Sequence, residues 1–166
     1  MTADDVKKVL GLARHPTCGF VAETYRSSRR IPGSAMPAPY VGDRAWGSAL
    51  YFLVTPDAQI VLHRIRQDQL YHHYLGDALD VLLLRPDGTG AVVTVGPDLA
   101  AGMRPQLFIP GGTFHMSRLH AGTGWALLAS TEWPGVEPAD VEHGDAEALA
   151  RRYPAMTAEI AAFTRS

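Results

Sequence analysis

Cysteine is almost absent from this chain of 166 residues, in which Cys18 is the one example. A single thiol forms no internal disulfide and builds no cysteine-based zinc site. The chain also lacks any apolar run of the ~18 residues that a membrane span needs, and its N-terminus, MTADDVKK, has no signal-peptide core. Charge of one sign is not in excess either, since 15 Lys and Arg face 17 Asp and Glu. We therefore expect a cytoplasmic protein with neither nucleic-acid nor membrane partners.

Short apolar runs separated by glycine and proline dominate the middle of the chain. Hydrophobic residues make up 46%, enough for one domain with its own core, and 16 Gly and 12 Pro lie between the runs. Strands are predicted at Ala49–Val54, Gln59–Ile65, Leu70–Tyr74, Leu79–Leu84, Ala91–Val95, Gln106–Ile109, Thr113–Ser117 and Trp125–Thr131, with a further strand at Phe20–Arg26. The spacing leaves no room for crossover helices, so it predicts an antiparallel sandwich or barrel.

The two ends of the chain have helical patterns. Apolar residues from Val6 to Ala13 repeat at helical spacing after a cap at Thr2 or Asp4. Asp145 caps a predicted helix that runs to Arg152, and a last helix is expected from Pro154. We expect one domain over residues 1–166, with an N-terminal helix in 1–14, a β-barrel in 15–134 and C-terminal helices in 145–166. The Ser- and Pro-rich segment 27–44 is expected to be a long loop and a candidate lid.

Histidines are the main candidates for chemistry, and strand parity decides which of them point inward. His63 shares a face with Val61 and Ile65 on one predicted strand. On other strands, Gln69, Tyr71 and His73 share a face, and His115 lies on the face of Thr113 and Ser117. Parity predicts that one cavity is lined by His63, Gln69, Tyr71, His73 and His115.

Two motifs among these residues resemble those of the cupin superfamily. Pro110-Gly111-Gly112-Thr113-Phe114-His115 matches the second cupin motif, a Pro-x-Gly turn followed by a His. The segment from His63 through Gln69 to Gly76 is similar to the first motif. Segments from about residue 15 to residue 154 resemble the DUF985-type (Cupin_5) branch: His15-Pro16, Gly19-Phe20, Glu23-Thr24-Tyr25-Arg26-Ser27, Tyr51-Phe52-Leu53, His63-Arg64-Ile65, Asp68, His72, Tyr74 with Gly76, Pro105-Gln106 and Pro134-Gly135. The resemblance implies an all-β cupin double-stranded β-helix, a jelly-roll-like barrel, with short terminal α-helices.

The departures from the cupin motifs bear on cofactors. The second His of the first motif is Ile65 here, and the Glu ligand is Gln69, a poorer ligand for a divalent cation. Three interpretations stay open. In the first, one divalent metal ion is held by His63, His73 and His115, with Gln69 as a weak fourth ligand. In the second, no cofactor is bound, and the acids and bases are His63, His115, Tyr71 and His73. In the third, the histidines only fill a polar interior.

The resemblance implies a small-molecule substrate in a pocket that we assign to Gln69, Glu23, Tyr25, Phe52 and Ile65. Cupins of this kind include isomerases, lyases and cyclases, among them tailoring enzymes of secondary metabolism, and that is the function expected here. The alternatives are a non-catalytic cupin that binds a sugar or small metabolite, and a metal-dependent cupin enzyme. The resemblance also implies a homodimer, since cupins commonly pair their sheets and two-fold pairing is the commonest closed assembly.

Overall fold

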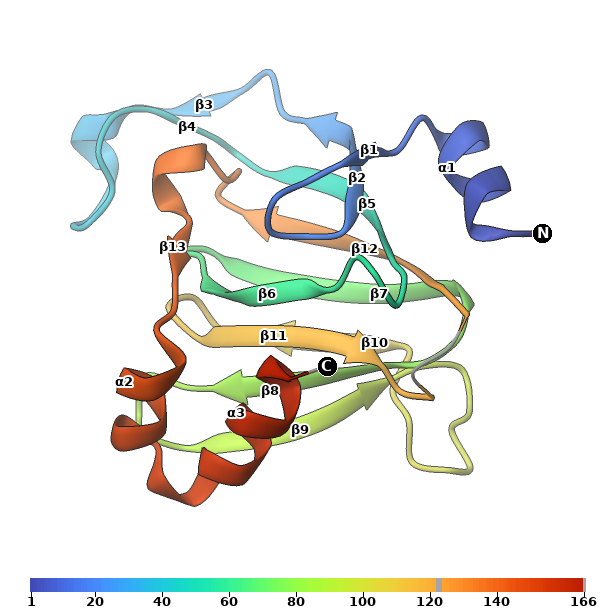
Figure 1. The fold of residues 1–166 in the computed structure, drawn as a ribbon. Helices are drawn as coiled ribbons and strands as arrows, with labels where there is room; N and C mark the ends of the chain where they lie inside the picture. The colour runs from blue at the N-terminus through green and yellow to red at the C-terminus, as the bar shows by residue number, and fades with distance from the viewer. Residues whose placement is uncertain (122–123, 166) are drawn as a thin grey trace.

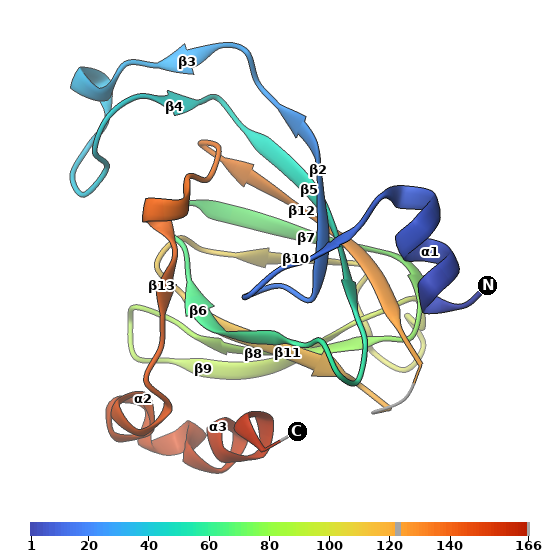
Figure 2. The same cartoon turned by 45° about the horizontal axis from the view of Figure 1, so that its top comes forward.

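Two β-sheets face each other in the computed structural model, which describes residues 1–121 and 124–165 (Figures 1 and 2). One sheet has the strand order β1-β2-β5-β12-β7-β10 and the other the order β13-β6-β11-β8-β9, and neighbouring strands are antiparallel in both. Short helices lie at both ends of the chain. The expected all-β fold is confirmed, although the strands form two sheets rather than a closed barrel. Ser166, the end of the predicted domain, lies outside the described residues.

The elements have the following bounds. The strands of the six-stranded sheet are β1 (Ala13–Arg14), β2 (Phe20–Arg26), β5 (Ser48–Val54), β7 (Asp68–Gly76), β10 (Gln106–Ile109) and β12 (Ala126–Trp133). Those of the five-stranded sheet are β6 (Ile60–Arg64), β8 (Leu79–Leu84), β9 (Gly90–Val95), β11 (Phe114–Leu119) and β13 (Glu142–His143). The remaining elements are α1 (Ala3–Leu10), β3 (Arg30–Ile31), β4 (Arg44–Ala45), α2 (Ala146–Arg152), α3 (Thr157–Thr164) and three short 3-10 turns, η1 (Gly33–Ala35), η2 (Pro138–Asp140) and η3 (Pro154–Met156).

The helix ends follow their capping residues. Thr2 caps α1 in a reciprocal capping box with Asp5, and Asp145 caps α2 as expected. The N-terminal helix was predicted too long, because Gly11 adopts φ 64° and ends it. Ala13 is therefore not helical but starts β1, which pairs with β2. At the other end, residues from Pro154 form a 3-10 turn before α3 begins at Thr157.

Three apolar clusters hold these layers together. The main core lies between the sheets and includes Phe52, Leu83 and Leu128. A second cluster packs α2 and α3 against the outer face of the five-stranded sheet, and a third packs α1 against the six-stranded sheet through Leu53 and Leu127. Each fully buried side chain of this size contributes about 1.5–3 kcal/mol. None of the described helices is long and apolar enough to cross a membrane.

The segment 27–44, the candidate lid, stands apart from the cavity between the sheets in this structure. Its ends pair as the two-stranded ribbon β3–β4, and the ribbon projects from the body of the molecule in Figure 2. None of its residues lines the cavity between the sheets.

The strand β13 lies outside the predicted barrel range of 15–134, because the chain returns after the barrel and pairs with β6. We call residues 134–141, which lead to β13, the strap.

Candidate functional site

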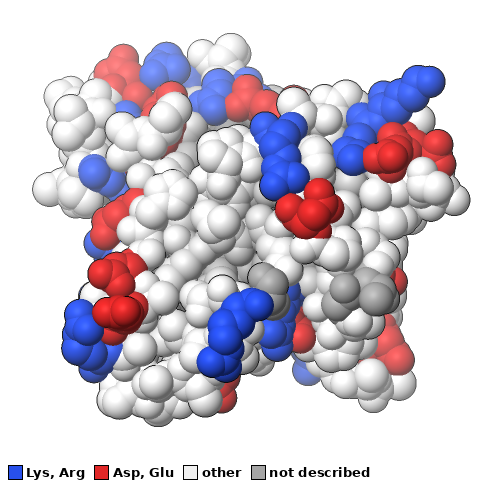
Figure 3. Space-filling view, in the orientation of Figure 1, with Lys and Arg blue, Asp and Glu red and all other residues white. Residues whose placement is uncertain are grey.

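A cavity of about 420 Å³ opens between the two sheets, within the size range of small-molecule pockets. Strands β2, β5, β6, β7 and β12, the loop before β2 and the strap each contribute to its wall. The lining residues are His15, Pro16, Thr17, Cys18, Glu23, Arg26, Ser48, Ala49, Leu50, Phe52, Ile60, His63, Ile65, Gln69, Tyr71, Ser130, Glu132, Val136, Glu137, Pro138, Val141 and His143. Figure 3 shows charges of both signs interspersed on this face of the molecule, without a broad area of one sign.

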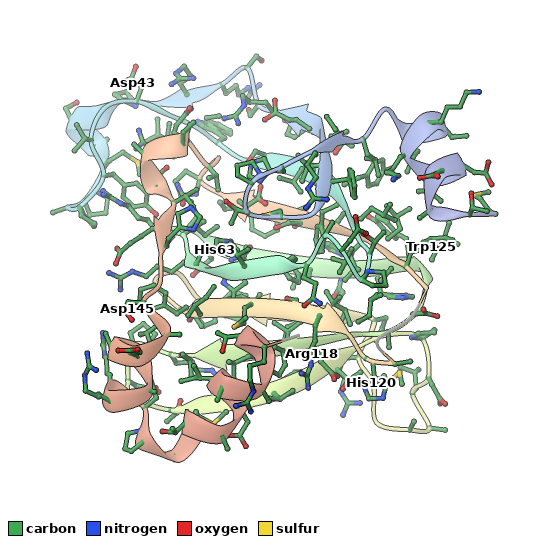
Figure 4. All side chains as sticks on the ribbon, in the orientation of Figure 1. Asp43, His63, Arg118, His120, Trp125 and Asp145 are labelled. Carbon is green, nitrogen blue, oxygen red and sulfur yellow. The ribbon has the colours of Figure 1, made fainter. Side chains whose placement is uncertain are left out.

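His63 is a buried imidazole in the pocket wall, on β6 beside β13 (Figure 4). Its Nδ1 lies 2.8 Å from the carbonyl oxygen of Val61, which can only accept, so Nδ1 carries the hydrogen. Burial lowers the pKa of His63 to about 4. The ring is therefore neutral at pH 7, and its Nε2 bears a lone pair that takes no hydrogen bond from the described residues.

His115 lies directly behind the pocket wall. It is the Cα partner of His63 across β6 and β11, and the two ring centroids are 4.2 Å apart. Gly111 makes the preceding turn possible, because a Cβ there would meet the carbonyl oxygen of Arg66. The Nδ1 of His115 donates to the carbonyl of Thr113 at 3.3 Å, which leaves Nε2 as an acceptor. Burial, and then the nearby His63, hold the pKa of His115 well below its usual range.

Tyr71 and Gln69 complete the hydrogen bonding of His115. The Tyr71 hydroxyl lies 3.1 Å from Nε2 of His115 and donates to its lone pair, and the Gln69 amide nitrogen, at 3.5 Å, shares this acceptor more weakly. Ser130 donates in turn to the amide oxygen of Gln69 at 3.4 Å. Burial raises the pKa of Tyr71 well above its usual range. The phenol thus keeps its proton and directs it to His115 rather than into the pocket.

The structure brings most of the predicted site residues together. His63, Gln69, Tyr71, Glu23, Phe52 and Ile65 line the pocket, and His115 supports Tyr71 from behind. Tyr25 does not line it: β2 carries a register shift between Glu23 and Tyr25, which breaks the strand parity and leaves Tyr25 58% exposed.

His73 was also predicted in this cavity, and that prediction is wrong. Its Nε2 bonds to the carbonyl oxygen of Asp77 at 3.0 Å, and the ring does not reach the pocket. His73 is four positions along the strand from Gln69, roughly 13 Å at the rise of a β-strand. Parity places the two side chains on one face of β7 but does not bring them to the same end of it.

The residues present do not fit a divalent metal ion. The set of His63, His73 and His115 with Gln69 is not assembled, since His73 lies elsewhere and Nε2 of His115 is occupied by Tyr71 and Gln69. Only the His63 nitrogen and a neutral amide remain, a poor donor set for such a cation. No group of three or more His, Cys, Asp or Glu residues in the described part of the chain is arranged to hold a metal ion.

Glu132 is a pocket residue that the sequence reasoning missed. It is 3% exposed, pairs in register with Gln69 on β7 and Ser48 on β5, and accepts a hydrogen bond of 2.7 Å from the Ser48 hydroxyl. Burial raises the pKa of this carboxyl. The signal was available, because Glu132 has the parity of Leu128 and Ser130, but the predicted strand ended one residue too early.

Other polar residues of the wall are a protonated thiol and a group of ion-paired side chains. Burial raises the pKa of Cys18 to about 12, so the thiol stays protonated and is a weak nucleophile. Arg26 bonds to the carboxylate of Glu23 at 2.6 Å and to that of Glu137 at 3.4 Å. These three residues form a charged group in the pocket wall where β2 approaches the strap.

The strap is tied down by a buried ion pair. Asp140 accepts hydrogen bonds from Arg44 at 2.9 and 3.1 Å and from the Gln67 amide at 2.6 Å. Burial raises the pKa of Asp140, but these bonds and one from the backbone of Glu137 outweigh it and lower the pKa. This cluster holds Val136, Glu137, Pro138 and Val141 of the strap against the pocket.

Comparisons with known proteins agree with this architecture. Residues 4–144 match a family model described as "Cupin superfamily (DUF985)". A hypothetical protein from Leishmania major is 26% identical over 98% of both chains, with a TM-score of 0.85. A Shewanella oneidensis protein is 30% identical over 98% of this chain and 97% of its own, with a TM-score of 0.82.

More distant solved structures share the fold alone. Oxalate decarboxylase from Bacillus subtilis is 14% identical, with a TM-score of 0.52 over 90% of this chain and 36% of the enzyme. No curated protein matches the sequence. The fold is thus a cupin fold, and function has to be argued from the pocket.

Proposed function

We propose that this chain, which belongs to the DUF985 family of the cupin superfamily, is a small-molecule isomerase, lyase or cyclase. The observation that carries the proposal is the state of His63. A neutral imidazole, fixed through Nδ1 to a backbone carbonyl, has a free Nε2 lone pair in the wall of the pocket. Such a group is a general base that stays active well below neutral pH, because its pKa is about 4.

His63 removes a proton from an acidic C–H or O–H of the substrate in this scheme. Its Nδ1–H bond to Val61 keeps the ring orientation while Nε2 gains the proton. In an isomerisation the imidazolium returns that proton to another atom of the same molecule, so His63 ends the reaction in its starting neutral form. In an elimination the proton goes to the leaving group instead.

Glu132 is the better candidate for the acid than Tyr71. The proton of Tyr71 points to His115, and the raised pKa of the phenol makes it reluctant to leave. Burial favours the protonated form of Glu132, and Ser48 holds its carboxyl in place. Its raised pKa lets Glu132 take up a proton more readily than an exposed carboxyl, and in that form it can donate to a carbonyl or leaving-group oxygen of the substrate.

Proton exchange tests the proposal without knowledge of the natural substrate. Small α-hydroxy and α-amino ketones would be incubated with the protein in D₂O, and deuterium uptake at the α-carbon would be followed by NMR. We expect uptake catalysed by the wild type to fall by about 10²–10⁴ in His63→Gln, the usual cost of losing a general base.

His72→Gln is the matched control. His72 lies on β7 and bonds to Thr131 and Gln106, outside the pocket lining, so its loss should leave exchange unchanged. Equal exchange by wild type and His63→Gln would contradict the proposal. Tight binding of the ketones without exchange would favour the alternative, a non-catalytic cupin that binds a small metabolite.

A further inference from the structure

We infer that the ligand of this pocket carries an amine or a similar set of hydrogen-bond donors at its buried end, and that carboxylates and phosphates are excluded. The inference concerns the same pocket as the proposed function and rests on that pocket being the functional site. It comes from the balance of donors, acceptors and charges among the lining residues.

Most donors of the pocket wall are already used within the protein. The hydroxyl of Tyr71 donates to His115, that of Ser48 to Glu132 and that of Ser130 to Gln69. All three nitrogens of Arg26 donate as well, to Glu23, Glu137 and the carbonyl of Val136. An anionic ligand, which offers only acceptors, would have to break these bonds.

The acceptors of the pocket are the groups left free. Nε2 of His63 has a lone pair with no donor among the described residues, although the side chain is 3% exposed. Tyr71 donates its one proton to His115 and so keeps lone pairs on its oxygen. Glu132 accepts a hydrogen bond from Ser48, and a carboxylate accepts several.

The charges favour the same class of ligand. Three carboxyl groups, those of Glu23, Glu132 and Glu137, line the pocket against the one guanidinium of Arg26. Arg26 is paired with Glu23 and Glu137, and in the described part of the chain no Lys, Arg or His forms an ion pair with Glu132. An excess of carboxyl groups over guanidinium groups, with the one guanidinium already paired to two of them, favours a cationic ligand.

Two of the donors that remain in the wall, on His15 and Gln69, limit the ligand further. The Nδ1 of His15 accepts from the backbone nitrogens of Thr17 and Cys18, so its Nε2 carries a hydrogen. Gln69 uses one of its two amide hydrogens on His115. One or two acceptors on the ligand, such as a carbonyl or hydroxyl oxygen, can therefore be served next to its amine. Phe52, Leu50 and Ile60 offer an apolar surface for the rest of the molecule.

Three probes of one skeleton test the inference by binding alone: benzylamine, benzyl alcohol and benzoate. Affinities would be measured by NMR titration at pH 7. We expect benzylamine to bind roughly tenfold or more tightly than benzoate, the effect of one charge-assisted hydrogen bond. Benzyl alcohol should lie between them.

Glu132→Gln should remove most of the preference for the amine, because it replaces the buried carboxyl by a neutral amide of the same shape. The control is Glu142→Gln, which changes a carboxylate outside this pocket and should keep the preference. Thermal melting would confirm that both variants fold, and Glu23→Gln offers a second pocket variant.

Preference for benzoate, equal affinities, or no binding of any of the three probes would overturn the inference. So would an unchanged amine preference in both Glu132→Gln and Glu23→Gln. The proposed function fails separately, through loss of the His63 effect on exchange, since the probes here bind without reacting.

Discussion

Burial without a charged partner sets the protonation of the two central histidines. His63 and His115 each lose solvation between the sheets, and each bonds through Nδ1 to a backbone carbonyl. Such a bond helps the charged form, but less than desolvation harms it, so the pKa of both rings falls. The neutral rings can then serve as acceptors: His115 for Tyr71, and His63 for a ligand.

The lowered pKa of His63 makes folding stability depend on pH. The unfolded chain binds a proton near pH 6.5 and the folded chain only near pH 4, so the free energy of unfolding decreases as pH falls through this window. A shift of this size corresponds to about 3 kcal/mol. In His63→Gln we expect a flatter dependence between pH 6.5 and 4, measured by urea denaturation. The half-exposed His120→Gln is the control, and an equally steep curve for His63→Gln would contradict this.

Glu132 should show the opposite dependence. Burial raises the pKa of this carboxyl, so its charge costs stability at pH 7, and that cost disappears as the group is protonated at lower pH. Glu132→Gln keeps the shape and the acceptor for Ser48 and should raise the melting temperature at pH 7. The gain should shrink as the pH falls toward 4. A variant less stable than wild type at pH 7 would contradict this prediction, because it would show that other groups of the protein stabilise the charged carboxylate.

Strand parity predicted part of the site and failed where the backbone is irregular or the strand is long. Gln69 and Tyr71 were placed correctly because they lie on a regular stretch of β7, whereas His63 lines the pocket despite a register shift between it and Ile60 on β6. Parity gives the face of a side chain but not its position along the strand, which is why His73 was misplaced. It also cannot anticipate a register shift such as the one before Tyr25.

At the scale of the elements, turn residues and apolar runs were reliable guides. The strands at Leu79–Leu84 and Gln106–Ile109 were predicted with their observed bounds. The strap was not foreseen. Its place depends on the contact between Asp140 and Arg44, 96 residues apart in the chain, and no local pattern indicates such a contact. For the same reason the sequence does not indicate that Arg44, the last residue of the segment 27–44, contacts the strap.

The Asp140 cluster should stabilise the strap strongly. Asp140→Ala leaves the buried guanidinium of Arg44 without its partner, and we expect it to lower the free energy of unfolding by about 3–5 kcal/mol. The exposed pair of Arg64 and Glu142 is the matched control, with 34% and 56% exposure. Glu142→Ala should cost no more than about 1 kcal/mol. Equal effects of the two variants in urea denaturation would contradict this account of the strap.

At the scale of the whole molecule, the outer face of the six-stranded sheet carries large apolar side chains that the described residues leave partly exposed. α1 packs over one part of it, but Tyr74, Phe108 and Trp133 remain about half exposed. On the other side of the molecule, α2 and α3 cover the outer face of the five-stranded sheet. Exposed aromatic side chains on one sheet face are typical of an interaction surface.

We expect this face to pair with a second copy of the chain in a homodimer, as the sequence resemblance implied. Light scattering at micromolar concentration should give twice the mass of 18.0 kDa. Phe108→Glu should shift the protein toward the monomer, while Val92→Glu, at an exposed position of β9, should not. A monomer mass for the wild type would contradict the expectation.

The central claim is that His63 presents a neutral Nε2 lone pair to the pocket, and ¹⁵N NMR of the histidine side chains tests it most directly. Selective labelling with His63→Gln as the assignment reference would identify its ring signals. The structure predicts a neutral ring with the hydrogen on Nδ1 at pH 7 and a titration midpoint near pH 4. A midpoint near 6.5, or a hydrogen on Nε2 at pH 7, would contradict the assignment of His63 as the base.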